Sequence, residues 1–178
     1  MGDPIPAESG ELGAVRTIPR ATPLVWRAAT TPSSIERWWA PAGIRASVRR
    51  FDLRPGGAVV LHLRHLPVLL TGTEGRPTPA AGVPLAFVLR GEVAAVEPER
   101  TLDLRLALEI DRRTPPVDAS LRFDFEAEGA ATRVSLRTAG HPSTSGPTVV
   151  GAGLGAQLER LEAVALAGVS DRPRSGGT

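Results

Sequence analysis

The side chains best suited to acid–base chemistry in this chain are two histidines at one predicted strand. His62 and His65 are three residues apart, and side chains alternate between the two faces of a strand, so they cannot bind one metal ion. Following the inward phase of Val59, Leu61 and Leu63, we expect His65 to face the interior and His62 to face solvent. His65 is therefore a candidate hydrogen-bonding group or base, and we expect no metal site.

A second candidate lies on the next predicted strand, where Arg90 and Glu92 share one phase. They would form a buried pair or a ligand clamp, or they would belong to a solvated face. His65 and Arg90 are the two weak catalytic candidates, and we assign no role to His141. Gly56 and Gly57 belong to a hairpin turn and not to a phosphate-binding loop, because no helix follows them.

The amino-acid composition excludes several kinds of catalytic group and metal site. The chain has no cysteine, which excludes a thiol nucleophile and a thiolate metal site. All 21 basic residues are arginine, which excludes a catalytic lysine and Schiff-base chemistry. No nucleophile elbow, Walker signature or zinc motif is present, and no serine has a partnered base in sequence. We expect no cofactor.

The charge pattern bears on partners and compartment. The net charge is only +2, and the pI near 10.7 reflects arginine staying protonated far above neutral pH. Basic and acidic residues alternate without a basic stripe, so we expect no nucleic-acid partner. There is no apolar run of about 18 residues and no signal peptide, which predicts a cytoplasmic protein without membrane contact. We expect a monomer or a weak homodimer.

The elements that must position these side chains form a single domain. We expect a flexible leader at 1–12, one domain over 13–169 and a disordered tail at 170–178. The Pro- and Gly-rich segment 66–84 is predicted to be a long loop between strands, and loops of that length are usually functional or mobile.

Two short helices are predicted near the start of the domain. Thr22 caps the first, with Pro23 at its first helical position, where a missing N–H costs nothing. Ser33 caps the second, which ends in the paired indoles of Trp38 and Trp39. These indoles would close over a ligand, or they would be core residues, and the sequence leaves both open. Trp26 is assigned to the core.

Alternating apolar and polar residues predict an antiparallel sheet of about six to seven strands, with one face wet and one covered. The predicted strands are 14–19, 46–53, 58–64, 85–96, 101–110, 117–127 and 132–138. Within 85–96, Gly91 indicates a bulge. A helix over 149–167 supplies the cover, and the order of elements gives an α+β fold with a curved sheet around that helix. Its glycines, among them Gly153 and Gly155, indicate fraying or a close backbone approach.

Several motifs in this order resemble a known family. They are VWRAATTPSSIERWWAPAG with FDLRPGG, then VEPERTL, FDFEAEGAATRVSLR and the terminal LERLEAVAL. Over roughly 14–168 the chain resembles the activator-of-heat-shock-protein-ATPase homologue (AHSA1-type) domain of the START-like, Bet v1-like SRPBCC superfamily. The resemblance implies a helix-grip fold with a cavity between sheet and long helix. Relatives include lipid and hormone binders, polyketide cyclases, co-chaperone domains and proteins that sequester toxic natural products.

The chain has leucines at several positions where members of that family carry aromatic residues. Family members commonly carry a Trp followed four residues later by a Phe, where this chain has Leu154 and Leu158. Aromatic residues are also often found where Leu61 and Leu63 stand. Unfilled core volume costs about 24 cal/mol per Å³, so either the backbone collapses or a ligand fills the space. We take these changes to favour a roomy apolar pocket.

The function expected from these observations is binding or sequestration of a hydrophobic small molecule, polycyclic or polyketide-like, in a setting of antibiotic biosynthesis or self-resistance. The alternatives are a cyclase- or aromatase-like enzyme using the same pocket and a co-chaperone-like interaction module. The residues expected to line the pocket are Trp38, Trp39, Phe51, Leu61, Leu63, His65, Phe87, Leu89, Leu104, Leu106, Phe123, Leu154 and Leu158.

Overall fold

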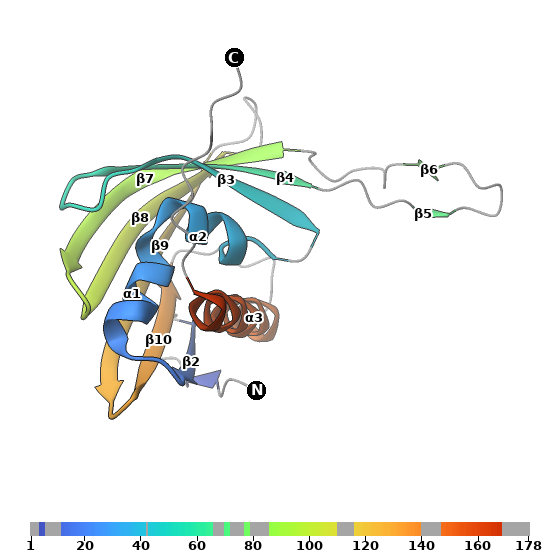
Figure 1. The fold of residues 1–178 in the computed structure, drawn as a ribbon. Helices are drawn as coiled ribbons and strands as arrows, with labels where there is room; N and C mark the ends of the chain where they lie inside the picture. Colours follow the sequence, from blue (N-terminus) through green and yellow to red (C-terminus); the bar gives the residue numbers. More distant parts are fainter. Residues whose placement is uncertain are drawn as a thin grey trace, which may run out of the picture.

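A curved antiparallel sheet holds one long helix against its concave face (Figure 1). The computed structural model describes residues 4–5, 12–41, 43–65, 70–71, 77–78, 86–109, 116–139 and 147–168. The long helix is α3 (Pro147–Ala167), and two short helices, α1 (Thr22–Thr30) and α2 (Pro32–Trp38), lie beside it. The α+β helix-grip arrangement expected from the sequence is confirmed.

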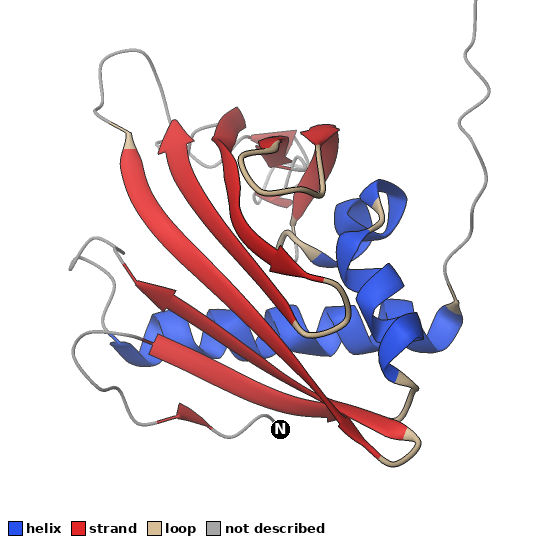
Figure 2. Ribbon diagram, turned by 90° about the vertical axis from the view of Figure 1, so that its left-hand side faces the viewer, coloured by secondary structure: helices blue, strands red, loops and turns tan. Residues whose placement is uncertain are grey.

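The main sheet contains every expected strand and one more. Its order is β1-β2-β10-β9-β8-β7-β4-β3, with all neighbours antiparallel, and Figure 2 shows its curl across the helices. The strands are β1 (Pro4–Ile5), β2 (Leu12–Ile18), β3 (Ile44–Phe51), β4 (Ala58–His65), β7 (Ala86–Glu97), β8 (Thr101–Glu109), β9 (Val117–Glu128) and β10 (Ala131–Ala139). The two residues of β1 pair with β2 from within the predicted leader.

The predicted long loop contains a small ladder of its own. Between β4 and β7, β5 (Leu70–Thr71) pairs with β6 (Pro77–Thr78) in a separate two-stranded sheet. The other residues of 66–84 lie outside the described residues, as does the predicted tail at 170–178.

The β3–β4 hairpin forms as predicted, and its turn depends on glycine. Gly56 has a φ of +72°, in the left-handed region that favours glycine. At Gly57 an added Cβ would lie 2.0 Å from the Asp52 carbonyl oxygen. The bulge expected at Gly91 is wrong in position, because the register shift falls between Val93 and Ala95.

The helix starts differ from the predicted caps by one or two residues. The N-cap of α1 is Ala21 and that of α2 is Thr31, and neither makes a side-chain capping bond. Thr22 is already helical, and its hydroxyl lies 3.1 Å from that of Thr132 on β10. The Thr22 side chain therefore joins α1 to the sheet, while Pro23 occupies the first turn as expected.

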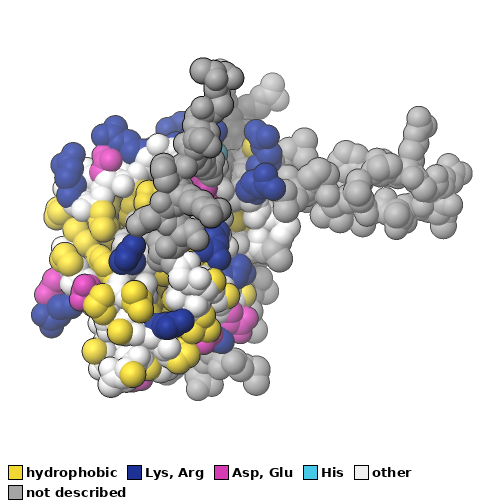
Figure 3. All heavy atoms as spheres, in the orientation of Figure 1, with side chains coloured by type: hydrophobic (Ala, Val, Ile, Leu, Met, Phe, Trp, Pro, Cys, Tyr) yellow, Lys and Arg dark blue, Asp and Glu magenta, His cyan; other side chains and the backbone are white. Residues whose placement is uncertain are grey.

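The convex face of the sheet carries exposed ion pairs between strands. Arg105 pairs with Glu92 across β8 and β7, and Arg122 pairs with Asp103 across β9 and β8. Basic and acidic side chains both appear on the face drawn in Figure 3. Among the described residues, no helix has the length and apolar character needed to cross a bilayer.

Candidate functional site

Burial along β8 shows that the two ends of the concave face are covered unequally. Leu102, Leu104 and Leu106 are buried, but Leu108, on the same face and one repeat further, is only half-buried. The core is therefore closed at the Leu102 end and less covered at the Leu108 end.

Aromatic rings fill the closed end. Trp26 of α1 meets Phe125 of β9 edge-on, with 5.2 Å between ring centroids. Trp38 of α2 meets Phe123 in the same manner at 5.8 Å. Such pairs contribute about 0.5–1.5 kcal/mol beyond the area they bury. The assignment of Trp26 to the core is confirmed.

The paired indoles at the end of α2 are core residues. Trp38 is buried and its Nε1 donates to the Ala28 carbonyl at 2.9 Å, which ties α2 to α1. Trp39 is also buried, and the two ring centroids are 5.3 Å apart. Both indoles therefore belong to the buried core cluster, and their contact with a ligand stays a prediction.

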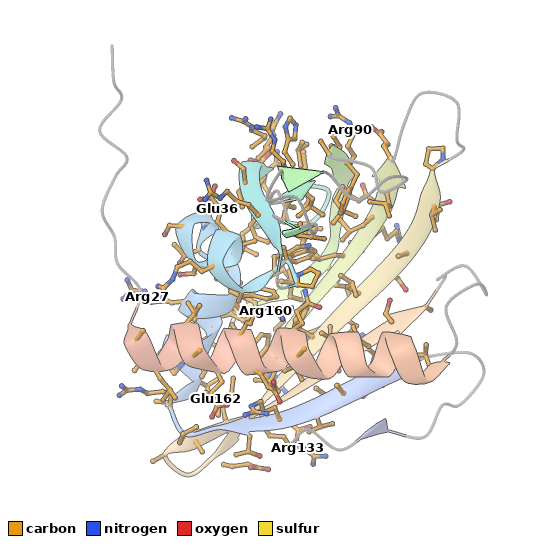
Figure 4. The ribbon with its side chains drawn as sticks, turned by 90° about the vertical axis from the view of Figure 1, so that its right-hand side faces the viewer. Arg27, Glu36, Arg90, Arg133, Arg160 and Glu162 are labelled. Atoms are coloured by element: carbon orange, nitrogen blue, oxygen red, sulfur yellow. The ribbon has the colours of Figure 1, made fainter. Side chains whose placement is uncertain are left out.

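Helix α3 holds the end of α2 through two side chains. Gln157 Nε2 donates to the Trp39 carbonyl and Arg160 Nε donates to the Trp38 carbonyl, each at 3.2 Å. These carbonyls lie at the C-terminal end of α2, where donors and positive charge are favourable. Burial lowers the pKa of Arg160, and the nearby Glu159 acts in the opposite direction. Figure 4 shows Arg160 on the side of α3 that faces α2.

A third polar contact fixes the other flank of α3. Arg16 stands at an inward position of β2, opposite the buried Val134 of β10. Its Nε lies 2.5 Å from Glu162 Oε2, and its Nη1 lies 3.5 Å from Glu159 Oε1. Glu162 points toward β2 in Figure 4. Sequence reasoning missed Arg16, Gln157 and Arg160, and the available signal was their polar character beside apolar stripes.

At the less covered end, large apolar side chains of the concave face are half-buried. The ladder register sets Val48, Leu61, Leu89, Leu108 and Val117 in one row across five strands, and of these Leu61 alone is fully buried. We define the open band as the half-buried residues of this row together with Phe87 and Leu121, which are half-buried on the same face of the sheet. It consists of Val48, Phe87, Leu89, Leu108, Val117 and Leu121.

The residues predicted to line a pocket lie on the inner side of the fold where they are described. The buried ones are Trp38, Trp39, Leu61, Leu63, Leu104, Leu106, Phe123, Leu154 and Leu158. Phe51, Phe87 and Leu89 are half-buried against the core. The backbone of His65 pairs with Ile44, and its side chain lies outside the described residues.

Of the two arrangements that the sequence left open for Arg90 and Glu92, the structure shows the solvated face and not a buried pair. Strand alternation turns Arg90 to the convex face, and its Nε lies 3.0 Å from Glu109 Oε2, with the two side chains 52% and 40% exposed. Glu92 pairs with Arg105 on β8 instead. His62 is exposed, as predicted from the same alternation.

Two glycines of α3, Gly153 and Gly155, have open space where a side chain would begin. An added Cβ at Gly153 or Gly155 would meet nothing within 4 Å. No protein atom of the described residues therefore approaches the backbone closely at these two positions.

The chain matches one family model and is similar in fold to several solved structures. The family model described as Activator of Hsp90 ATPase homolog 1-like protein matches residues 21–165. A Chromobacterium violaceum crystal structure is similar, with a TM-score of 0.69 and 17% identity, covering 88% of this chain and 97% of that one. The solution structure of an AHSA1-like protein from Aeromonas hydrophila has a TM-score of 0.63 and 19% identity, covering 87% and 92%. A protein from Arthrobacter aurescens has a TM-score of 0.69 and 15% identity, covering 99% and 98%. At these identities the likeness concerns the fold, and no curated protein matches the chain.

Proposed function

The chain belongs to the family of Activator of Hsp90 ATPase homolog 1-like proteins, and from that premise we propose that it binds a hydrophobic small molecule against the open band. The observation that carries the proposal is the loss of burial along one face of β8, from Leu106 to Leu108. A ligand that covers this concave, partly exposed apolar surface would be stabilised by the apolar area that it removes from water.

The proposed driving force is apolar burial. Covering half-buried Leu, Val and Phe side chains contributes roughly 25 cal/mol per Å² of apolar surface removed from water. Every member of the open band is apolar, and the neighbouring inward positions Leu104, Leu106 and Ala119 are apolar too. Such a surface favours binding of a rigid polycyclic or aliphatic body, with orientation set by few polar groups.

The proposal is for binding and includes no catalytic step. Arg90 lies on the convex face, away from the open band. The inward orientation of the His65 side chain stays a prediction, because that side chain lies outside the described part of the structure. A cyclase-like enzyme would show turnover of an added polyketide, and a co-chaperone-like module would change a partner's ATPase rate. Both alternatives therefore differ from simple binding in their readouts.

A substitution that places a larger side chain in the open band tests the proposal. We expect the wild type to bind N-phenyl-1-naphthylamine with enhanced probe fluorescence, and Leu108→Trp to weaken binding at least tenfold by occupying the same space. Leu166→Trp is the matched control, because Leu166 is an exposed leucine on α3. Equal binding by wild type and Leu108→Trp, with both variants folded, would contradict this site.

A further inference from the structure

Charge is distributed unequally over the convex face of the sheet. On the strands from β7 to β10 both signs occur, and arginines such as Arg105 and Arg122 pair with Glu92 and Asp103. The edge strand β3 and its neighbour β4 contain arginine and histidine but no aspartate or glutamate. Among the described residues, no ion pair joins β3 or β4 to another strand. The positive charge of these two strands is therefore not balanced within the sheet.

Three exposed arginines of these two strands form a group that we call the arginine strip, which consists of Arg45, Arg49 and Arg64. Arg45 and Arg64 are direct partners across the ladder, so their side chains leave the same face of the sheet. Arg49 is exposed at the bulge in β3. In the part of the chain that the structure describes, none of the three has an ion pair or a side-chain hydrogen bond. Like charges directly opposite one another destabilise a sheet, so an acidic partner would relieve a repulsion that the fold leaves in place.

The carboxylates that flank β3 in the chain are already engaged. Asp52, which follows the last residue of β3, accepts a hydrogen bond from Arg50 Nε at 2.8 Å. Glu36 of α2, labelled in Figure 4, accepts a backbone N–H of β3 through Oε1 at 2.9 Å. This contact occupies the outer edge of β3, where another strand would otherwise extend the sheet. A partner of the arginine strip is therefore expected on the convex face and not along that edge.

We propose that the arginine strip binds an acidic, extended segment of a partner protein. Strand residues rise about 3.3 Å each, so Arg45 and Arg49 begin roughly 13 Å apart along β3. An extended segment with carboxylates at alternate residues repeats at a similar scale, and guanidinium groups bind carboxylates through two parallel hydrogen bonds. The strip lies on the face of the sheet opposite to the open band, so this inference is independent of the proposed function.

The neighbours of the strip favour a protein segment over other anionic partners. A single strand of nucleic acid would need aromatic side chains on which its bases stack, and no aromatic residue among the described ones is exposed. A membrane surface would need exposed apolar side chains beside the arginines. The exposed large apolar residues, Leu24, Leu53 and Leu166, all lie outside β3 and β4.

Fluorescence anisotropy with a labelled peptide tests the inference. The probe is a peptide of about ten residues in which glutamate and serine alternate, measured at low ionic strength because salt screens exposed charges. The wild type should bind it, and should not bind the same peptide with glutamine in place of glutamate. The triple variant Arg45→Gln, Arg49→Gln, Arg64→Gln should bind the acidic peptide about tenfold more weakly, because three exposed ion pairs of modest strength are lost.

A matched variant separates the strip from net charge. Arg105→Gln, Arg122→Gln, Arg137→Gln removes the same charge from convex-face arginines that already have acidic partners, and should keep the wild-type affinity. Equal weakening in both triple variants, or no binding by the wild type, would overturn the inference. Equally tight binding of a thymidine oligonucleotide or of phosphatidylserine vesicles would overturn the choice of an acidic protein segment.

The stability of a single variant gives a second readout. Because Arg45 faces Arg64 directly across the ladder, Arg45→Gln should leave the melting temperature unchanged or raise it. A clear fall in the melting temperature would mean that Arg45 already has a stabilising partner within the fold, and would overturn its assignment to a free binding surface.

Discussion

The indole Nε1 of Trp38 lies 2.9 Å from the carbonyl oxygen of Ala28, in the interior between α1 and α2. The same tryptophan offers its own carbonyl to Arg160 of α3, so one residue links all three helices. Its ring also packs edge-on against Phe123 of the sheet. The position of α2, and with it the cover of the concave face, depends on this residue.

Replacing the indole of Trp38 should substantially lower the free energy of unfolding. Trp38→Phe leaves the buried Ala28 carbonyl without its donor and opens a small cavity. We expect the free energy of unfolding to fall by about 2–4 kcal/mol, as for comparable core truncations. Urea unfolding followed by circular dichroism measures it, with Leu53→Ala at an exposed position as the control. A loss below about 1 kcal/mol would contradict the assigned role.

The ion pair between Arg16 and Glu162 should contribute more than an exposed pair. Both side chains are about four-fifths buried, at 22% and 19% exposure, whereas Arg100 and Glu97 are exposed at 75% and 58%. A double-mutant cycle with Arg16→Met and Glu162→Gln should give a coupling of about 1 kcal/mol, after allowance for solvent screening. The Arg100–Glu97 cycle should give a value near zero. Similar couplings for the two pairs would show that α3 is not held by this contact.

Alanine should have opposite effects at two glycines. Gly153→Ala adds a methyl group to a helix where nothing lies within 4 Å, and should raise the free energy of unfolding by up to about 1 kcal/mol. Gly57→Ala places a methyl group 2.0 Å from the Asp52 carbonyl oxygen and should lower it. Thermal unfolding of the two variants compares the signs directly. A lower melting temperature for Gly153→Ala would mean that this turn of α3 needs glycine.

Arg160→Met should loosen the end of α2 without a strong dependence on pH. Burial lowers the pKa of Arg160. Arginine nevertheless remains protonated throughout the neutral range, so its contribution stays constant there. Loss of the bond to the Trp38 carbonyl should cost about 1–2 kcal/mol between pH 6 and pH 9. Denaturant unfolding at several pH values measures this cost, and a cost that changes through that range would point to a different titrating group.

Much of the interior could be predicted because strand periodicity is local. Leu102, Leu104 and Leu106 alternate with Asp103 and Arg105 in the sequence, and alternation alone assigns them to opposite faces of the sheet. The same rule correctly turned His62 outward. For Arg90 and Glu92 the sequence left a buried pair and a solvated face open, and choosing between them required knowing which strand lies beside β7.

Contacts between distant segments could not be predicted in this way. The Arg16–Glu162 pair joins residues 146 positions apart, and Gln157 reaches a carbonyl 118 positions earlier in the chain. Backbone carbonyls at a helix end have no signature in the sequence, so the polar character of Gln157 and Arg160 beside an apolar stripe did not identify the Trp39 and Trp38 carbonyls as their partners.

The sequence by itself determined the α+β class, the strands, the long terminal helix and the face on which each strand residue stands, because these follow from short-range periodicity. The tertiary structure alone decided how far the helices cover the concave face. It buried Leu106 and left Leu108 half-buried on the same strand. Docking of α1, α2 and α3 depends on long-range packing, and that packing sets both the open band and the orientation of the Gln157 amide.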